Sequence, residues 1–326
     1  MSKKKRVLMT EPIHEIGMRL IKARDDVELV IAPDTSVETL TALVEDVHGI
    51  AIRLALLPAE VLTVARNLQI VSRHGVGCDN VDVDHLTARG IPMAIAAGAN
   101  AVSVSEHTLM LMLACTRGLL KQDRRIRDGG FRDRDGLVGG DLEGSRVLVV
   151  GFGRVGRQVA RRCRAMGMEV TVADIELDRA LAAEMGCRAV EDFRPELARA
   201  DFLSLHVPLD SSTRNLVGDD ELAAMPKSAI VINCARGGIV DEAALVRALD
   251  SRHIHAAGVD VFDPEPPAAD HLLFKRDDVV LTPHTAAASR GSMLEMARMT
   301  MQNILDCFDG RLRDDCTFNL RGLRQR

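Results

Sequence analysis

Three polar side chains in the second half of the chain each follow a short apolar run, and their types suit anion binding and proton transfer. Arg236, Glu265 and His284 lie just beyond three runs that we predict to be strands. An arginine offers a planar fork to a carboxylate, and a histidine near an acid exchanges protons close to neutral pH. Taken singly, such residues are more often a surface arginine, a loop acid and a structural histidine. Because ligands of open α/β sheets bind beyond the carboxyl ends of strands, the three together indicate a catalytic site.

A glycine motif upstream of these residues is typical of nucleotide binding. Gly151-Phe152-Gly153-Arg154-Val155-Gly156 joins a predicted strand, Arg146–Val150, to a predicted helix, Arg157–Met166. A second predicted strand, Glu169–Ala173, ends at Asp174, which lies 18 residues after Gly156. Gly151 allows the tight turn, Gly153 lets a pyrophosphate approach the backbone, and Gly156 lets helix and strand pack closely. The combination predicts a dinucleotide-binding βαβ unit, and the alternative is a glycine-rich turn that binds nothing.

Composition narrows the class of protein. With 326 residues, two domains are expected, and a net charge of −5 gives no reason to expect a nucleic-acid partner. The longest apolar run, Leu109–Cys115, is too short to cross a membrane. Seven scattered cysteines show neither a disulfide framework nor metal-ligand spacing, so we expect no metal and a reducing, cytoplasmic location. The basic segment Lys3–Arg6 is interpreted as a solvated tail and not as a targeting signal.

Apolar runs alternate with helical segments along the whole chain, which predicts an α/β protein with two doubly wound parallel-sheet domains. Residues 100–287 are expected to form a Rossmann NAD-binding domain, inserted in a flavodoxin-like substrate-binding domain of residues 1–99 that is completed by residues 288–326. The predicted strands outside the glycine unit are Arg6–Met9, Val27–Val30, Gly49–Ile52, Leu68–Ser72, Pro92–Ala94, Phe202–His206, Ala229–Asn233, His255–Val259 and Val279–Leu281.

Two long helices are also expected. One covers Ser103–Leu120 and starts with a capping box from Ser103 to Glu106, and the other covers Ser289–Phe308. Between the first helix and the glycine unit, Lys121–Gly144 is charged, rich in glycine and without periodicity. We therefore predict a long loop there, of the kind that is functional, interfacial or mobile.

Across nearly its whole length the chain resembles the D-isomer-specific 2-hydroxyacid dehydrogenase family, and it is most similar to the D-3-phosphoglycerate dehydrogenase branch. We expect no counterpart of the long C-terminal regulatory domain that some phosphoglycerate dehydrogenases carry. Feedback by serine through such a domain is therefore not expected. The segments that carry the resemblance, in this order, are Ser72–Asp82, Asn100–His107, Gly151–Gly156, Asn233–Gly237, Gly258–Pro266 and Thr282–His284.

This resemblance implies a role for each motif. Arg236 would hold the substrate carboxylate and polarise its carbonyl, His284 would be the general acid and base, and Glu265 would be its acidic partner. The cofactor would be NAD, which exchanges a hydride with C2 of the substrate. The residues that would contact NAD are those of the glycine motif (Gly151, Gly153, Arg154, Val155, Gly156), Asp174 at the ribose, His206, Val207 and Pro208 near the adenine, and Cys234, Ala235 and Asp260 at the carboxamide.

The substrate is expected to be a small anion. By the same resemblance, backbone N–H groups of Gly75, Val76 and Gly77 would line a carboxylate site, and Asn100 is a further candidate there. Arg53, Arg73 and His74 could accommodate additional negative charge, as a phosphorylated hydroxyacid would carry. Relatives pair their nucleotide domains through the region that corresponds to 103–144, so a homodimer is expected. Phe131, His74 and Thr285–Ala287 depart from the common family pattern and leave the substrate open.

Two alternatives remain from the sequence. Within enzymes, the rival is a glyoxylate or hydroxypyruvate reductase. Formate dehydrogenases place an amide where Glu265 stands, which argues against them. In a different class, NAD-binding corepressors on this fold keep the arginine, the acid and the histidine, so these three residues do not exclude a corepressor-like protein without significant turnover.

Overall fold

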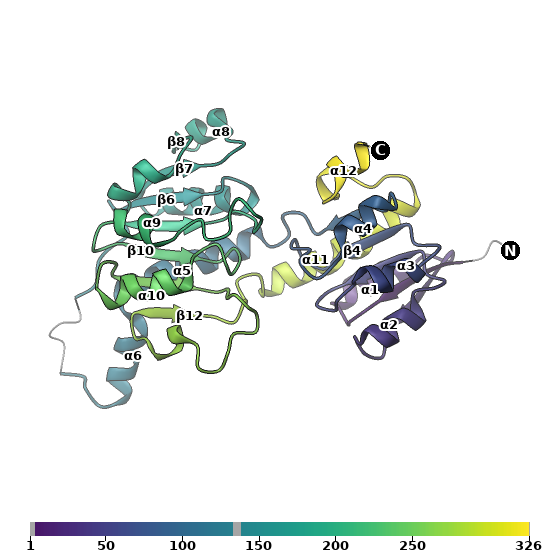
Figure 1. Ribbon diagram of the computed structural model, residues 1–326, viewed down its shortest axis with the longest axis horizontal. Helices are drawn as coiled ribbons and strands as arrows, with labels where there is room; N and C mark the ends of the chain where they lie inside the picture. The colour runs from purple at the N-terminus through teal and green to yellow at the C-terminus, as the bar shows by residue number, and fades with distance from the viewer. Residues whose placement is uncertain (1–3, 133–137, 326) are drawn as a thin grey trace. The chain divides into compact units, whose positions relative to one another are not determined.

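The computed structural model describes residues 4–132 and 138–325, which divide into two compact units. The first unit comprises Met1–Asn100 and Ala288–Arg326, and the second comprises Ala101–Ala287. The sequence placed the same division one residue earlier, after residue 99. Both chain ends lie in the first unit, and the second is a continuous insertion (Figure 1).

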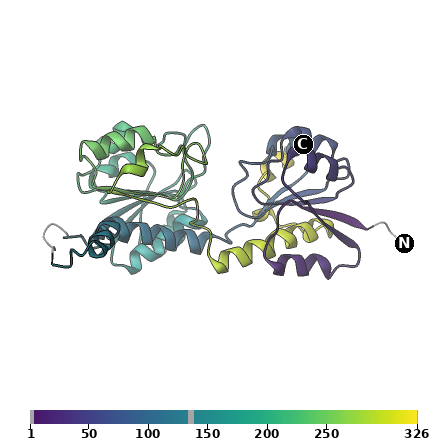
Figure 2. The same cartoon turned by 90° about the horizontal axis from the view of Figure 1, so that it is seen from below.

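The first unit is a parallel five-stranded sheet between helices. Its strand order, β2-β1-β3-β4-β5, is the flavodoxin-like order that was predicted. Helices α1 (Glu15–Lys22) and α11 (Arg290–Phe308) pack on one face, and three short helices cover the other (Figure 2). These are α2 (Val37–Leu43), α3 (Ala59–Val64) and α4 (Val83–Ala88). The strands are β1 (Lys5–Met9), β2 (Val27–Ile31), β3 (Gly49–Ile52), β4 (Ile70–Arg73) and β5 (Met93–Ile95), and η3 (Asp314–Cys316) and α12 (Leu320–Arg324) follow α11.

The second unit is a parallel seven-stranded sheet with the order β12-β11-β10-β9-β6-β7-β8, which contains the doubly wound nucleotide-binding order. One face packs on α5 (Ala101–Arg117), α7 (Arg154–Ala165) and α8 (Arg179–Glu184), and the other on η1 (Arg194–Arg199), α9 (Asp219–Ala224) and α10 (Glu242–Asp250). The strands are β6 (Arg146–Val150), β7 (Glu169–Ala173), β8 (Arg188–Val190), β9 (Phe202–Leu205), β10 (Ile230–Asn233), β11 (Ala256–Val259) and β12 (Val279–Leu281); α6 (Leu119–Arg127) and η2 (Leu272–Lys275) complete the unit.

The predicted strands are all present, with ends that differ by at most two residues. Burial explains this agreement, since the central strands β9, β10 and β11 are buried at every position and read as continuous apolar runs. The edge strand β8 was not predicted, because it has three residues and begins with the exposed Arg188. Since every strand is parallel to its neighbours, all the loops that follow strands lie along one edge of each sheet.

The helical predictions need three corrections. Helix α5 starts at Ala101, so Ser103 and Glu106 lie inside it and form no capping box. Gly118, with a left-handed φ of 58°, separates α5 from α6, which occupies part of the stretch predicted as loop. Residues 133–137 of that stretch lie outside the described residues. Helix α7 starts at Arg154 and not at Arg157, because Gly153 already serves as its N-cap residue.

Candidate active site

The predicted catalytic and cofactor residues of the second unit all follow strands along the carboxyl edge of its sheet. The glycine motif follows β6, Asp174 follows β7, and His206 follows β9. The three catalytic candidates follow the neighbouring strands on the other side of the sheet. Arg236 comes after β10, Glu265 after β11 and His284 after β12.

His284 and Glu265 form a hydrogen-bonded pair. Nδ1 of His284 lies 2.7 Å from Oε2 of Glu265, while Oε1 of Glu265 accepts a hydrogen bond of 3.0 Å from the backbone N–H of Phe262. Burial alone would raise the pKa of Glu265, but the hydrogen bonds from His284 and Phe262 and the charges of His284 and Arg236 outweigh it and hold this pKa below its ordinary value. Glu265 is therefore an anion at neutral pH and fixes one nitrogen of the imidazole.

The loop that carries Arg236 is shaped by two neighbours. The Asn233 side chain accepts from the N–H of Ala235 and donates to the carbonyl of Arg236, which closes a tight turn after β10. A Cβ on Gly237 would lie 1.8 Å from the carbonyl oxygen of Phe262, so only glycine lets this loop approach the loop after β11 so closely. The same two loops carry Arg236 and Glu265, and the charge of Arg236 acts on Glu265 as described above.

Asp260 organises the turn that carries His284. Its side chain is fully buried, and its carboxylate accepts hydrogen bonds from the Thr282 hydroxyl (2.5 Å) and from the N–H groups of Thr285 and Ala286 (both 2.9 Å). The sequence assigned Asp260 only to a nicotinamide contact and gave Thr282 and His107 no role. Thr282 could have been noticed because it directly follows β12, two residues before His284. His107 is 175 residues from Thr282, and nothing in the sequence pairs them.

The glycine motif has the shape that a dinucleotide requires. Gly151 has a φ of +95°, and a Cβ on Gly156 would lie 1.8 Å from the carbonyl oxygen of Gly151, so neither position accepts a side chain. A Cβ on Gly153 would meet nothing within 4 Å, which leaves space beside the N-terminus of α7. That terminus has no side-chain cap, so its N–H groups can bind phosphate. The residues present therefore fit the predicted cofactor.

Asp174 supports the glycine motif and keeps acceptor positions that a ribose could use. Its Oδ2 accepts a hydrogen bond of 2.6 Å from the N–H of Phe152, and Oδ1 accepts one of 2.9 Å from the N–H of Glu176. A carboxylate has about four acceptor positions, so two remain for ribose hydroxyls. The arrangement agrees with the role that the resemblance implies for Asp174.

Two further predicted contacts carry no charge at neutral pH. Burial lowers the pKa of His206 to about 3, and its Nε2 lies 2.8 Å from the Ser204 hydroxyl. Burial raises the pKa of the Cys234 thiol to about 12, helped by the nearby Asp260 and Cys115 and opposed by a hydrogen bond with Thr108. His206 is neutral, and Cys234 is a packed thiol and not a nucleophile. Val207 and Pro208 follow His206 in the loop after β9. The backbone N of Val207 would lie 3.0 Å from a Cβ on Gly151, so this loop packs closely against the glycine motif.

The first unit presents the predicted substrate residues along the carboxyl edge of its own sheet. Glu11, which the sequence reading missed, follows β1 and accepts from the N–H groups of Arg53, Leu54 and Ala55. The guanidinium of Arg53 makes no ion pair or hydrogen bond with any residue between 4–132 or 138–325. The guanidinium of Arg73 donates to the carbonyls of His74 and Gly77, so it stabilises the Gly75–Gly77 loop from within. Asn100 is buried at the end of this unit.

His74 differs from its expected role as a source of positive charge. It is only 4% exposed, and its Nε2 has no partner among the described residues. Burial, together with the charges of Arg53 and Arg73, lowers the pKa of His74 to about 4. Hydrogen bonds of the imidazole with its own backbone and with the backbone of Met293 oppose this shift. His74 is therefore neutral at pH 7, and Arg53 is the residue of this group whose charge stays available.

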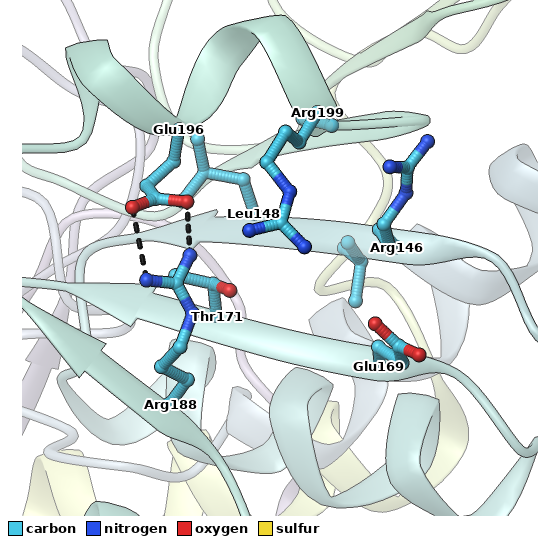
Figure 3. Close-up of a pocket in the computed structure, with 9 residues that line it drawn as sticks. Arg146, Leu148, Glu169, Thr171, Arg188, Glu196 and Arg199 are labelled. Atoms are coloured by element: carbon cyan, nitrogen blue, oxygen red, sulfur yellow. Dashed lines mark hydrogen bonds and ion pairs between the residues drawn. The ribbon is translucent and has the colours of Figure 1, made fainter.

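A hollow at the other edge of the seven-stranded sheet is not a rival site. It lies at the amino ends of β6, β7 and β8, and the ion pair between Arg188 and Glu196 lies on its lining (Figure 3). Arg188 pairs with Glu196, and Arg146 pairs with Asp201 at 3.0 Å. None of the predicted catalytic or cofactor residues lines it.

Two searches of the described residues gave no result. Within residues 4–132 and 138–325, no helix is both long and apolar enough for a membrane span. The same residues contain no group of three or more histidine, cysteine or acidic side chains that could hold a metal ion.

Comparison with known proteins agrees with this geometry. A family model described as the NAD-binding domain of D-isomer specific 2-hydroxyacid dehydrogenases matches residues 109–286. D-3-phosphoglycerate dehydrogenase of Archaeoglobus fulgidus is 38% identical over 94% of this chain, which spans 58% of that protein's length. Glyoxylate reductase of Korarchaeum cryptofilum is 34% identical over 93% of this chain and 92% of its own. The NADPH-dependent glyoxylate/hydroxypyruvate reductase of Sinorhizobium meliloti has a similar structure, with a TM-score of 0.83, 30% identity and coverage of 94% and 95% of the two chains.

Proposed function

The chain belongs to the D-isomer specific 2-hydroxyacid dehydrogenase family, and from this premise we propose that it transfers a hydride between NAD and C2 of a small D-2-hydroxyacid or its 2-oxoacid. The observation that carries the proposal is the 2.7 Å contact between Nδ1 of His284 and Glu265, on the sheet edge that also holds the glycine motif and Arg236. When bound, NAD supplies or accepts the hydride.

The protein's own residues then bind the substrate and move one proton. Arg236 holds the carboxylate of the substrate and polarises the oxygen on C2. Because Glu265 accepts the proton on Nδ1, Nε2 of His284 is the nitrogen that faces the reaction, and it forms no hydrogen bond with any described residue. In reduction, Nε2 gives its proton to the oxygen as C2 receives the hydride. In oxidation, neutral Nε2 takes the hydroxyl proton, and Glu265 stabilises the resulting imidazolium.

Turnover of NADH with a panel of 2-oxoacids tests the proposal, using the wild type and His284→Ala. We expect the wild type to reduce at least one member and His284→Ala to lose most of the rate. Both proteins should still enhance the fluorescence of bound NADH. NADH binding without turnover of any 2-oxoacid would favour the corepressor-like alternative.

Two substrate classes follow from two observations. The guanidinium of Arg53, which has no partner among the described residues, favours a phosphorylated three-carbon acid, such as the substrate that the name of the Archaeoglobus relative implies. The end-to-end similarity to glyoxylate reductase favours a small unphosphorylated 2-oxoacid. We expect Arg53→Ala to lower kcat/KM about tenfold or more for the phosphorylated acid and little for glyoxylate. If kcat/KM were equal for the two acids and unchanged in Arg53→Ala, Arg53 would not recognise a phosphate, and the small unphosphorylated 2-oxoacids would be the favoured substrate class.

The cofactor, assembly and location complete the proposal. We propose NAD rather than NADP because the carboxylate of Asp174 would repel a 2′-phosphate, and a homodimer because α5 and α6 expose apolar side chains. A reducing, cytoplasmic compartment is supported by the cysteines, all seven of which are free. Cofactor preference and assembly are tested by the predictions in the Discussion.

A further inference from the structure

A hydrogen-bond chain links helix α5 to the turn that carries His284. Nε2 of His107, on α5, lies 2.9 Å from the Thr282 hydroxyl, and that hydroxyl lies 2.5 Å from Oδ1 of Asp260. Nε2 of His107 is also 3.6 Å from the same Oδ1. The His107 side chain is 14% exposed and that of Asp260 is fully buried, so water competes little for these contacts.

The direction of each hydrogen bond follows from the available protons. Asp260 takes donors on both carboxylate oxygens and acts as the acceptor, so the single proton of the Thr282 hydroxyl points to Oδ1. The hydroxyl must then accept its other hydrogen bond. Nε2 of His107 therefore carries a proton and donates it to Thr282.

At its other end, this chain fixes three successive backbone N–H groups. The N–H of His284 donates to the Asp260 carbonyl at 2.7 Å, and those of Thr285 and Ala286 donate to the Asp260 carboxylate. His284 itself has a left-handed φ of 51°, a conformation that is unfavourable for a residue other than glycine. The turn keeps this unfavourable conformation because Asp260 binds all three N–H groups.

We propose that His107 is a positioning residue for His284, acting through Thr282 and Asp260 without touching the substrate. With its N–H on Thr282, it keeps the hydroxyl directed at Asp260 and the carboxylate directed at Thr285 and Ala286. Without it, the hydroxyl can turn away, the carboxylate gains freedom to rotate, and the turn that presents Nε2 of His284 loosens. The expected change in kcat rests on the proposed function, whereas the expected loosening of the turn at His284 rests on the hydrogen bonds alone.

The test compares His107→Leu with His107→Gln, whose amide can place an N–H donor near the same position. Loss of one hydrogen bond of about 0.5–1.5 kcal/mol predicts that His107→Leu lowers kcat by about 2- to 13-fold, with little change in KM. It should also raise the deuterium isotope effect from 4-deuterated NADH, because the chemical step becomes slower. His107→Gln should restore most of kcat. His253→Leu is the matched control, because His253 precedes β11, at the opposite end of that strand from Asp260, and its imidazole hydrogen-bonds with the carbonyl of Ala223.

A second measurement needs no cofactor and no turnover. Hydrogen–deuterium exchange of the free protein should be faster in His107→Leu at the amides of residues 284–286 and unchanged in the core strands. If the wild type reduces no 2-oxoacid, the proposed function fails while the exchange experiment still tests the hydrogen-bond chain. Wild-type kcat and exchange in His107→Leu would overturn the inference. So would equal losses in His107→Leu and His107→Gln with equal drops in melting temperature, because His107 would then act only by packing.

Discussion

Nδ1 of His284 and Oε2 of Glu265 lie 2.7 Å apart, although 19 residues separate them in the chain. The two residues follow adjacent strands, β11 and β12, so parallel pairing brings their loops together. Because an ionised carboxylate only accepts hydrogen bonds, the contact fixes the proton of a neutral imidazole on Nδ1 and turns Nε2 to the chemistry. Glu265 therefore determines the tautomer of the neutral His284 ring and supplies the negative charge next to its imidazolium form.

Replacing Glu265 by Gln should move both pH profiles to lower pH. The amide keeps an acceptor for Nδ1 but removes the negative charge that stabilises imidazolium, so His284 loses its proton more easily. Reduction, in which Nε2 gives up a proton, should therefore decline at lower pH than in the wild type, and oxidation should begin correspondingly earlier. Steady-state rates in both directions from pH 5 to 10 provide the measurement. Asp263→Asn is the control, because this neighbouring carboxylate faces Arg214 at 2.7 Å and should leave both profiles in place.

Two alanine substitutions in the glycine motif should have different consequences. At Gly153 a Cβ meets no atom within 4 Å, so Gly153→Ala should fold, with about 1 kcal/mol lost at the helix N-cap. The new methyl group enters the space expected for pyrophosphate, so the Kd for NADH should rise at least about tenfold. At Gly156 the Cβ would lie 1.8 Å from the carbonyl of Gly151, so Gly156→Ala should lose about 3 kcal/mol of stability.

Urea unfolding and NADH fluorescence together separate these outcomes. Gly291→Ala is the reference, because a Cβ there meets nothing and a helical alanine should stabilise by about 0.4–1 kcal/mol. Unchanged NADH affinity in Gly153→Ala would show that the cofactor does not approach this position.

The sequence predicted the fold, and it predicted that three candidate catalytic residues lie at one edge of a sheet, for a physical reason. Buried parallel strands are continuous apolar runs, and the residues just beyond them share one edge, so Arg236, Glu265 and His284 could be brought together before any coordinates were considered. The contact network around them was less accessible. Asp260 was expected only to contact the carboxamide, and the structure adds that its carboxylate accepts hydrogen bonds from Thr282, Thr285 and Ala286.

Errors arose where a local pattern competes with tertiary packing. Ser103 and Glu106 have capping-box spacing, but two further residues, from Ala101 on, join the helix. Most residues of helix α6 are charged or polar, and none of them is buried. The helical spacing of its few apolar residues was therefore not recognised in the sequence. His74 seemed a cation next to the carboxylate loop, and only its burial shows that it is neutral.

Replacing Asp174 by Asn should narrow the preference for NADH over NADPH. The asparagine keeps an oxygen for the N–H of Phe152, which now lies 2.6 Å from Oδ2, but removes the charge that repels a 2′-phosphate. The ratio of kcat/KM values for the two cofactors should fall about tenfold or more, a change of at least about 1.4 kcal/mol in discrimination. Glu176→Gln removes an exposed acid two residues later and should alter the ratio little. If wild-type protein used both cofactors equally, Asp174 would not be the discriminating residue.

The apolar side chains on α5 and α6 predict a dimer. Met110 and Leu113 on α5 are 44% and 38% exposed, and Leu119, Leu120 and Ile126 on α6 are between 48% and 53% exposed. Sedimentation equilibrium at micromolar concentration should give twice the chain mass of 35.5 kDa. A Leu113→Glu and Ile126→Glu double variant should sediment as a monomer, since it places charge in the contact. Ile31→Glu, at a comparably exposed residue of the first unit, should remain a dimer; a monomeric wild type would refute the assignment.

His74 should make the stability of the protein depend on pH below neutrality. Its pKa is about 4 in the folded protein against 6.5 for an unperturbed histidine, so between these values the unfolded chain binds a proton that the folded chain refuses. Stability from this residue is therefore complete above about pH 6.5 and falls as pH decreases, by at most about 1.4 kcal/mol per pH unit. His206 acts in the same direction, so the comparison must be with a variant of His74 alone.

Urea unfolding of His74→Asn should show a shallower loss of stability from pH 6.5 to 4 than the wild type. Ser72→Ala removes a buried, unpartnered hydroxyl two residues earlier without a titrating group, so its slope should match the wild type. Parallel curves for wild type and His74→Asn would mean that His74 takes up its proton in the folded state as readily as in the unfolded one.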